Sequence, residues 1–155
     1  MSKPLYIFDL DGTLALIGHR RHFVECPREQ QDWAGFYAAC DKDEPNNPVI
    51  ALWTQLRNAG ADIWIFSGRS NEVFDKTQEW LKQNLGTYYW NFGHYLMMRD
   101  SGDFTPDDVL KKQWLDAMLP EDRERLVCVF DDRDRVVKMW RDNGITCLQV
   151  APGEF

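Results

Sequence analysis

Short apolar runs alternate with longer amphipathic stretches along the whole chain. A continuous apolar run of about four to six residues is typical of a strand buried on both faces of a parallel sheet. Such runs, ending in the more mixed last one, predict strands at residues 5–8, 63–66, 95–98, 126–130 and 145–150.

Apolar residues between these runs recur at helical spacing. We expect one helix to begin at Pro48 after an Asn47 N-cap, and another to begin at Pro106 after a Thr105 N-cap. Two more are predicted over residues 71–83 and 133–143. Strands that alternate with helices predict an α/β fold, a three-layer α/β/α sandwich around a parallel sheet. At 155 residues, the chain forms one domain in this interpretation.

Carboxylates follow the first and fourth predicted strands. Asp9 and Asp11 come directly after residues 5–8, and Asp131 and Asp132 come after residues 126–130. Residues i and i+2 of a strand point the same way, so Asp9 and Asp11 share one side. Two carboxylates at such a short distance repel each other unless a cation or a shared proton lies between them.

Composition narrows the classes of function. No apolar stretch approaches the length of a membrane span, and the N-terminus lacks the apolar run of a signal peptide, which predicts a cytoplasmic protein without a membrane partner. The net charge of −7 disfavours general attraction to a nucleic-acid duplex. It leaves room for a phosphorylated ligand held by a local basic patch. The four cysteines form no Cys-x-x-Cys pair, so we expect reduced thiols.

The segment Asp9-Leu-Asp11-Gly-Thr13-Leu resembles the first signature of the haloacid dehalogenase (HAD) superfamily. The resemblance implies a phosphatase in which Asp9 attacks phosphorus to form an aspartyl phosphate and Asp11 is the general acid and base. Ser67 stands where the second signature is expected, after a predicted strand. By the same resemblance, Thr13, Ser67 and Gly68 bind the substrate phosphate.

The third and fourth signatures concern a cation and a metal ion. Lys111 matches the lysine that neutralises the nucleophile and phosphate, with Lys112 as the alternative. Asp107 lies four residues before Lys111 on one helix face, where the two can pair. The resemblance implies Mg²⁺ held by Asp9, the carbonyl of Asp11 and one of Asp131 or Asp132. The sequence leaves open which of the last two binds directly.

Residues 15–44 lie where this superfamily inserts its cap, and their length allows only a small cap or flap. A small cap leaves the site open and favours a bulky or polymeric substrate. Within it, Trp33, Phe36, Tyr37 and Cys40 follow helical spacing. Two interpretations remain: a stripe that packs in the core, or an aromatic wall on which a base stacks.

A narrower resemblance covers almost the whole chain, to the phosphatase domains of phage polynucleotide kinases. Besides the four signatures, it is carried by Arg20, Asn47-Pro48, Arg69, Asp107 and Arg133. It implies removal of 3′-phosphates from nucleic-acid ends during repair, with Arg20, Arg69 and Asp107 contacting or orienting the substrate phosphate and Lys111. The sequence contains no Gly-x-x-x-x-Gly-Lys-Ser/Thr loop, so 5′-phosphorylation is not implied and a separate kinase or ligase partner is conceivable.

Two alternatives stay open at this point. One is a small-molecule nucleotidase or general HAD phosphatase, and the other is a binding module that keeps the HAD fold without catalysis. DNA or RNA preference and oligomeric state are not determined by the sequence.

Overall fold

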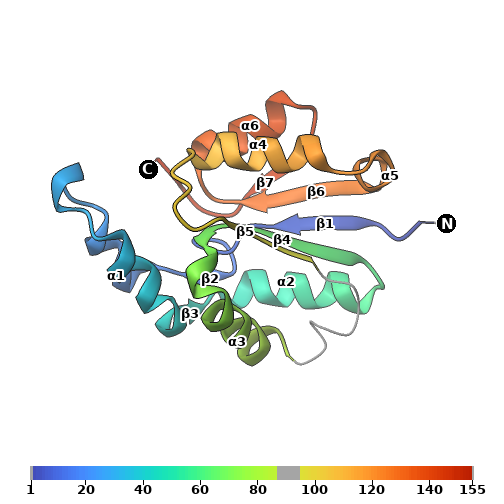
Figure 1. The fold of residues 1–155 in the computed structure, drawn as a ribbon. Helices are drawn as coiled ribbons and strands as arrows, with labels where there is room; N and C mark the ends of the chain where they lie inside the picture. The colour runs from blue at the N-terminus through green and yellow to red at the C-terminus, as the bar shows by residue number, and fades with distance from the viewer. Residues whose placement is uncertain (1, 87–94, 155) are drawn as a thin grey trace.

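A parallel five-stranded sheet forms the centre of the computed structural model, which describes residues 2–86 and 95–154 (Figure 1). Its strands run in the order β5-β4-β1-β6-β7, and every neighbouring pair is parallel. The strands are β1 (Leu5–Phe8), β4 (Asp62–Ser70), β5 (Tyr95–Arg99), β6 (Leu126–Asp131) and β7 (Cys147–Gln149). All five predicted strands are therefore present, although β4 continues to Ser70, past the predicted end.

Helices cover both faces of this sheet (Figure 1). One face carries α2 (Asn47–Asn58) and α3 (Phe74–Leu85). The opposite face carries α4 (Asp107–Ala117) and α6 (Asp134–Asp142), with the short α5 (Pro120–Glu124) before β6. The predicted three-layer α/β/α fold is confirmed. In the described part of the chain, no helix combines the length and apolarity needed to cross a bilayer.

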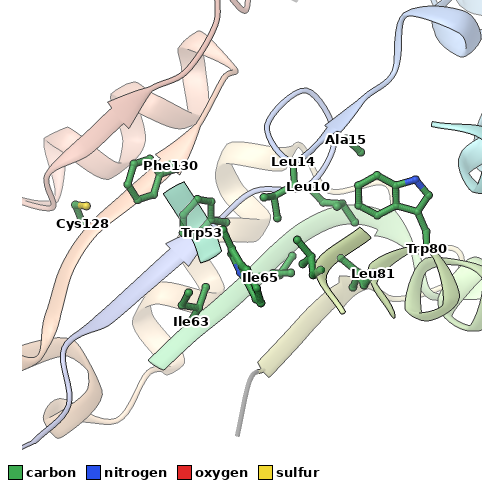
Figure 2. Close-up of a cluster of buried hydrophobic side chains, with 12 residues drawn as sticks. Leu10, Leu14, Ala15, Trp53, Ile63, Ile65, Trp80, Leu81, Cys128 and Phe130 are labelled. Carbon is green, nitrogen blue, oxygen red and sulfur yellow. The ribbon is translucent and has the colours of Figure 1, made fainter. Parts of the chain in front are cut away.

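Alternation along the strands divides the core into two clusters. Phe8 packs with Trp53 of α2 and Trp80 of α3, whereas its neighbour Ile7 packs with Trp140 of α6 on the other face. Successive strand residues point to opposite faces, so a continuous apolar run supplies both layers. Figure 2 shows the first cluster, where Trp53 lies beside the strand residues.

The segment between β1 and α2 stands beyond the carboxyl ends of the strands (Figure 1). Its two ends are joined by an antiparallel pair, β2 (Ala15–Leu16) with β3 (Glu44–Pro45). Between them lie the 3₁₀ turns η1 (Gly18–Phe23), η2 (Arg28–Gln30) and η3 (Ala39–Lys42), and the helix α1 (Trp33–Ala38). We call residues 15–45 the flap.

Three predicted helix starts differ from the structure. Thr105 is not an N-cap; its hydroxyl donates to Asp103 Oδ1 (2.6 Å), and α4 begins at Asp107 after Pro106. Asn47 is the first residue of α2 and not its cap. Residues Asn71–Val73 form the 3₁₀ turn η4 ahead of α3. Local hydrogen bonds compete with helical ones at Thr105 and at η4, where Ser70 Oγ accepts from the backbone N–H of Glu72. Sequence patterns resolve such boundaries poorly.

Candidate active site

Three buried carboxylates meet at the carboxyl ends of two adjacent strands. Asp9 follows β1, Asp131 ends β6, and Asp132 comes next. One carboxylate oxygen from each lies within 4.8 Å of the others. The juxtaposition follows from the topology, because β1 and β6 are parallel neighbours and their carboxyl ends share one edge.

Lys111 neutralises part of this cluster. Its Nζ donates to Asp9 Oδ1 (2.7 Å) and to Asp131 Oδ2 (2.8 Å), and the side chain is buried. Lys112, the alternative weighed from the sequence, instead pairs with Asp116 on the exposed side of α4. The structure thus brings Lys111, and not Lys112, to the carboxylates.

The three carboxylates carry more negative charge than Lys111 neutralises. Burial raises the pKa of Asp9 well above its ordinary value, and the charge of Lys111 offsets only part of that effect. Burial and the charge of Asp131 raise the pKa of Asp132 to about 6. Burial alone would lower the pKa of Lys111, but Asp131 and Asp9 raise it, so the ammonium stays charged. Three buried carboxylates facing one ammonium fit the oxygen donor set of a hard divalent cation.

Asp11 is held by two guanidinium groups instead of joining the acidic cluster. Its Oδ1 accepts from Arg20 Nη2 (2.7 Å) and from Arg69 Nε (2.7 Å). Both arginines are fully buried and also donate to Asp43, at 2.7 Å from Arg20 Nε and 2.6 Å from Arg69 Nη2. His19 Nε2 lies 2.8 Å from the same carboxylate. Arg20 and Arg69, predicted to touch or orient substrate phosphate, thus lie between Asp11 and Asp43.

We call Arg20, Arg69 and Asp43 the clamp on Asp11, and its two arginines keep Asp11 charged. Burial would raise the pKa of its carboxyl group, but the charges of Arg69 and Arg20 outweigh burial and hold the pKa below its ordinary value. Asp11 is therefore ionised in the resting protein at neutral pH.

Two predicted phosphate-binding hydroxyls are buried near the nucleophile and the clamp. Thr13 Oγ1 donates to Asp9 Oδ2 over 3.4 Å. Ser67 Oγ accepts from the backbone N–H of Arg69 (3.2 Å) at the end of β4. Each hydroxyl therefore contacts a group of the site.

Asp107 forms ion pairs away from Lys111, contrary to the expected pairing along α4. Its carboxylate accepts from both Arg99 and Arg133. Lys111 instead turns inward, because two buried carboxylates offer it a stronger field than one half-exposed neighbour. Arg99 Nε also donates to the carbonyl of Gly68 (2.9 Å), and a Cβ at Gly68 would stand 2.8 Å from Asp107 Oδ1. A side chain at position 68 would therefore displace the Asp107 carboxylate from its present position.

Gly12 lets the chain leave β1 beside the carboxylates. Its φ is +84°, and a Cβ there would stand 2.1 Å from Asp132 Oδ2. Only glycine satisfies both conditions, since the left-handed conformation and the close approach each exclude a side chain.

A cavity of about 1010 Å³ opens above these groups. Asp9, Asp11 and Lys111 line it, as do Trp33 and Tyr37 of the flap helix α1. The predicted aromatic stripe divides accordingly: Phe36 and Cys40 are buried, while Trp33 is 42% exposed.

Sequence reasoning missed Asp43, His19 and Arg99. Arg99 ends β5, so the rule that ligands gather at the carboxyl ends of parallel strands identifies it in retrospect. His19 lies in the 3₁₀ turn η1 and Asp43 directly follows η3, and no periodic signal in the sequence marks either residue.

Residues 3–155 match the family described as the polynucleotide kinase PNKP phosphatase domain. The chain belongs to this family. The resemblances to HAD phosphatases and to polynucleotide kinase phosphatase domains are thereby confirmed, and the chain is a HAD-type phosphatase domain.

Similar proteins are longer than this chain. "Putative bifunctional polynucleotide kinase/RNA ligase" of Autographa californica nuclear polyhedrosis virus is 32% identical over 136 residues, which are 86% of this chain and 17% of that protein. A chain in the structure of the Pnkp1/Rnl/Hen1 RNA repair complex is 28% identical with a TM-score of 0.77, covering 99% of this chain and 44% of that one. This chain thus spans less than half the length of either.

A more distant structure shares the fold alone. The class C acid phosphatase from Bacillus anthracis is 14% identical, with a TM-score of 0.64 over 99% of this chain and 68% of that one.

Proposed function

We propose that this chain is a Mg²⁺-dependent phosphomonoesterase that removes 3′-phosphates from polynucleotide ends through an aspartyl phosphate. The supporting observation is the buried set Asp9, Lys111, Asp131 and Asp132 at the floor of a large cavity, with Asp11 beside it. Membership of the polynucleotide kinase phosphatase family supports the substrate class.

In the first step, an oxygen of Asp9 attacks phosphorus. A bond forms between that oxygen and phosphorus as the bond from phosphorus to the substrate 3′-oxygen breaks, and Asp11 gives its proton to the leaving oxygen. Lys111 holds Asp9 Oδ1 at 2.7 Å, which orients the carboxylate and reduces its repulsion from the phosphate.

In the second step, water attacks phosphorus of the aspartyl phosphate. Asp11 takes the proton from this water, the bond between Asp9 and phosphorus breaks, and inorganic phosphate leaves. Asp9, Asp131, Asp132 and the carbonyl of Asp11 would hold Mg²⁺. When bound, the ion supplies positive charge that neutralises phosphate oxygens as their charge develops.

Asp11 must gain a proton before it can act as an acid, because the two arginines keep it ionised. A phosphomonoester with a second pKa of about 6 arrives partly as the monoanion, which carries such a proton. That proton can reach the leaving oxygen by way of Asp11, which holds it only transiently because its pKa is the lower of the two.

The flap fits the role of a small cap. Its two ends supply Arg20, which donates to Asp11, and Asp43, which accepts from Arg20. Helix α1 forms one side of the cavity. We propose that residues 1–155 act as one phosphatase domain, and that a separate kinase or ligase works on the same ends. One relative is named for both kinase and ligase activities, and a related chain lies in an RNA repair complex; both support that partnership.

A side-by-side assay tests the proposal. Oligonucleotides with a 3′-phosphate, the same strands with a 5′-phosphate, and 3′-mononucleotides are compared with Mg²⁺ and with chelator. We expect release from the 3′-phosphorylated strand only, loss of activity by roughly 10⁴-fold or more in Asp9→Asn, and no change in the exposed Asp142→Asn. Equal rates on 3′- and 5′-phosphates would refute the end preference. Higher rates on mononucleotides would favour a nucleotidase, and no turnover at all would leave a binding module.

A further inference from the structure

Two large aromatic side chains on the cavity wall are exposed to solvent. Phe104, between β5 and α4, is 88% exposed, and Trp33 at the start of α1 is 42% exposed. Both line the cavity that holds Asp9 and Lys111. An exposed ring of this size forgoes about 1.5–3 kcal/mol of burial, so its position at a reaction cavity points to a ligand that covers it.

The loop around Phe104 is firmly bonded, so the exposure of the ring does not come from a loose segment. Asp103 Oδ1 accepts from the backbone N–H of Thr105 (2.8 Å) and from its hydroxyl (2.6 Å). Arg99 Nη1 donates to the carbonyls of Asp103 (3.2 Å) and Thr105 (2.6 Å). Residues on both sides of Phe104 are therefore fixed while its ring stands in solvent.

Trp33 is also supported from behind. Its ring lies edge-on to Phe36 (centroids 5.6 Å apart) and 5.9 Å from Tyr37, and its Nε1 donates to Gln31. Phe36 in turn lies under the Arg20 guanidinium, 4.2 Å from its ring. A continuous series of ring contacts thus runs from Arg20 to Trp33, and it supports the indole at the cavity, which reduces the ordering cost of binding there.

The charge and the size of the site indicate what these rings bind. The cavity of about 1010 Å³ holds far more than a phosphoryl group. The net charge is −7, and nine Asp or Glu residues line this cavity beside six Lys or Arg residues, so a polyanion meets no general attraction. Binding of a nucleic-acid end must then come from short-range contacts, and stacking on an aromatic ring supplies about 1–3 kcal/mol per base.

We propose that Trp33 and Phe104 stack on unpaired nucleobases next to the 3′-terminal phosphate, so that the substrate is a single-stranded end. This inference rests on the proposed function and specifies its substrate. Bases in a duplex are already stacked and paired, and their faces are not available to these rings.

The test measures binding in the Asp9→Asn protein with Mg²⁺, so that turnover does not interfere. The probe is a 5′-labelled, 3′-phosphorylated single-stranded tetranucleotide, followed by fluorescence anisotropy. Trp33→Ala and Phe104→Ala should each weaken binding about 5- to 150-fold, the equivalent of 1–3 kcal/mol. Phe104→Leu should lose nearly as much, since leucine keeps apolar bulk but has no ring face. Phe74→Ala is the matched control, a 37% exposed ring at the start of α3 outside the cavity lining.

A second probe separates stacking from other effects. The same strand with its two 3′-terminal bases removed should bind weakly to the parent protein and equally to all the variants. A blunt duplex with a 3′-phosphate should also bind weakly. Equal losses with and without bases, no loss in either variant, or blunt-duplex binding as tight as single-strand binding would each overturn the inference.

The two proposals fail in different ways. If the wild-type protein hydrolyses 3′-phosphates but the ring variants bind as the parent does, the stacking site is wrong and the function stands. If binding depends on the rings but no 3′-phosphate is hydrolysed, the stacking site stands and the function is wrong.

Discussion

Replacing Lys111 with methionine removes the ammonium that faces Asp9 and Asp131 and keeps the length of the side chain. The two ion pairs, at 2.7 and 2.8 Å, are each worth about 6 kcal/mol of Coulomb energy at an effective dielectric constant near 20, most of it offset by desolvation. Breaking a buried pair from one side leaves an uncompensated charge and costs about 3–5 kcal/mol. For a chain of this size, that lowers Tm by about 10 °C.

Thermal unfolding in chelator at pH 8 measures this cost. Lys112→Met is the matched control, because Lys112 is the next residue of α4 and pairs with the exposed Asp116, a contact worth about 0.3–0.5 kcal/mol. Mg²⁺ should restore part of the loss in Lys111→Met by neutralising the carboxylates. Lowering the pH to 5 should also narrow the deficit, since carboxylates with raised pKa values take up protons. Equal melting of the two variants in chelator would show that Lys111 does not neutralise the cluster.

Three more predictions follow from the same groups. The pKa of Asp132 is raised to about 6 in the folded protein, so in chelator this group contributes at most about 3 kcal/mol to the free energy of unfolding. That contribution is complete below pH 4 and is lost as the pH rises through 6. Thermal melts from pH 4 to 8 with and without Mg²⁺ test it, and a pH dependence that Mg²⁺ does not flatten would contradict it. Gly12→Ala should destabilise the protein and abolish activity. Gly60 is also at positive φ, but a Cβ added there would meet nothing within 4 Å, so Gly60→Ala should cost only the conformational strain of about 1–2 kcal/mol. Similar melting temperatures for the two variants would refute the close-approach argument. Asp43→Asn should lower kcat roughly 10- to 100-fold on a 3′-phosphorylated strand and much less on an aryl phosphate with a good leaving group. Asp41→Asn, at an exposed residue, is the control. An equal fall of kcat on both substrates would mean that Asp43 does not act through the general acid Asp11.

The sequence by itself determined the layers of the fold and the edge at which the chemistry sits. Continuous apolar runs indicate strands buried on both faces, and Asp9 and Asp131 follow two such runs. Parallel strands align their carboxyl ends at one edge of the sheet. The local sequence pattern, which predicts parallel strands, therefore already implies that Asp9 and Asp131 lie at the same edge.

Only the tertiary structure decided which charges pair. Lys111 and Lys112 are adjacent, and helical spacing offers Asp107 as a partner for the first. The structure instead turns Lys111 inward to Asp9 and Asp131. The choice depends on burial, because a charge removed from water pairs with whatever opposite charge surrounds it in three dimensions.

The clamp on Asp11 and the exposure of Trp33 and Phe104 were likewise decided by the tertiary structure alone. Arg20 and Asp43 are separated by more than twenty residues of the flap, and they meet because β2 and β3 bring the flap's ends together. Periodicity reports which face of a local element is apolar. It carries no information about side chains whose neighbours come from distant segments, since their surroundings exist only after the chain has folded.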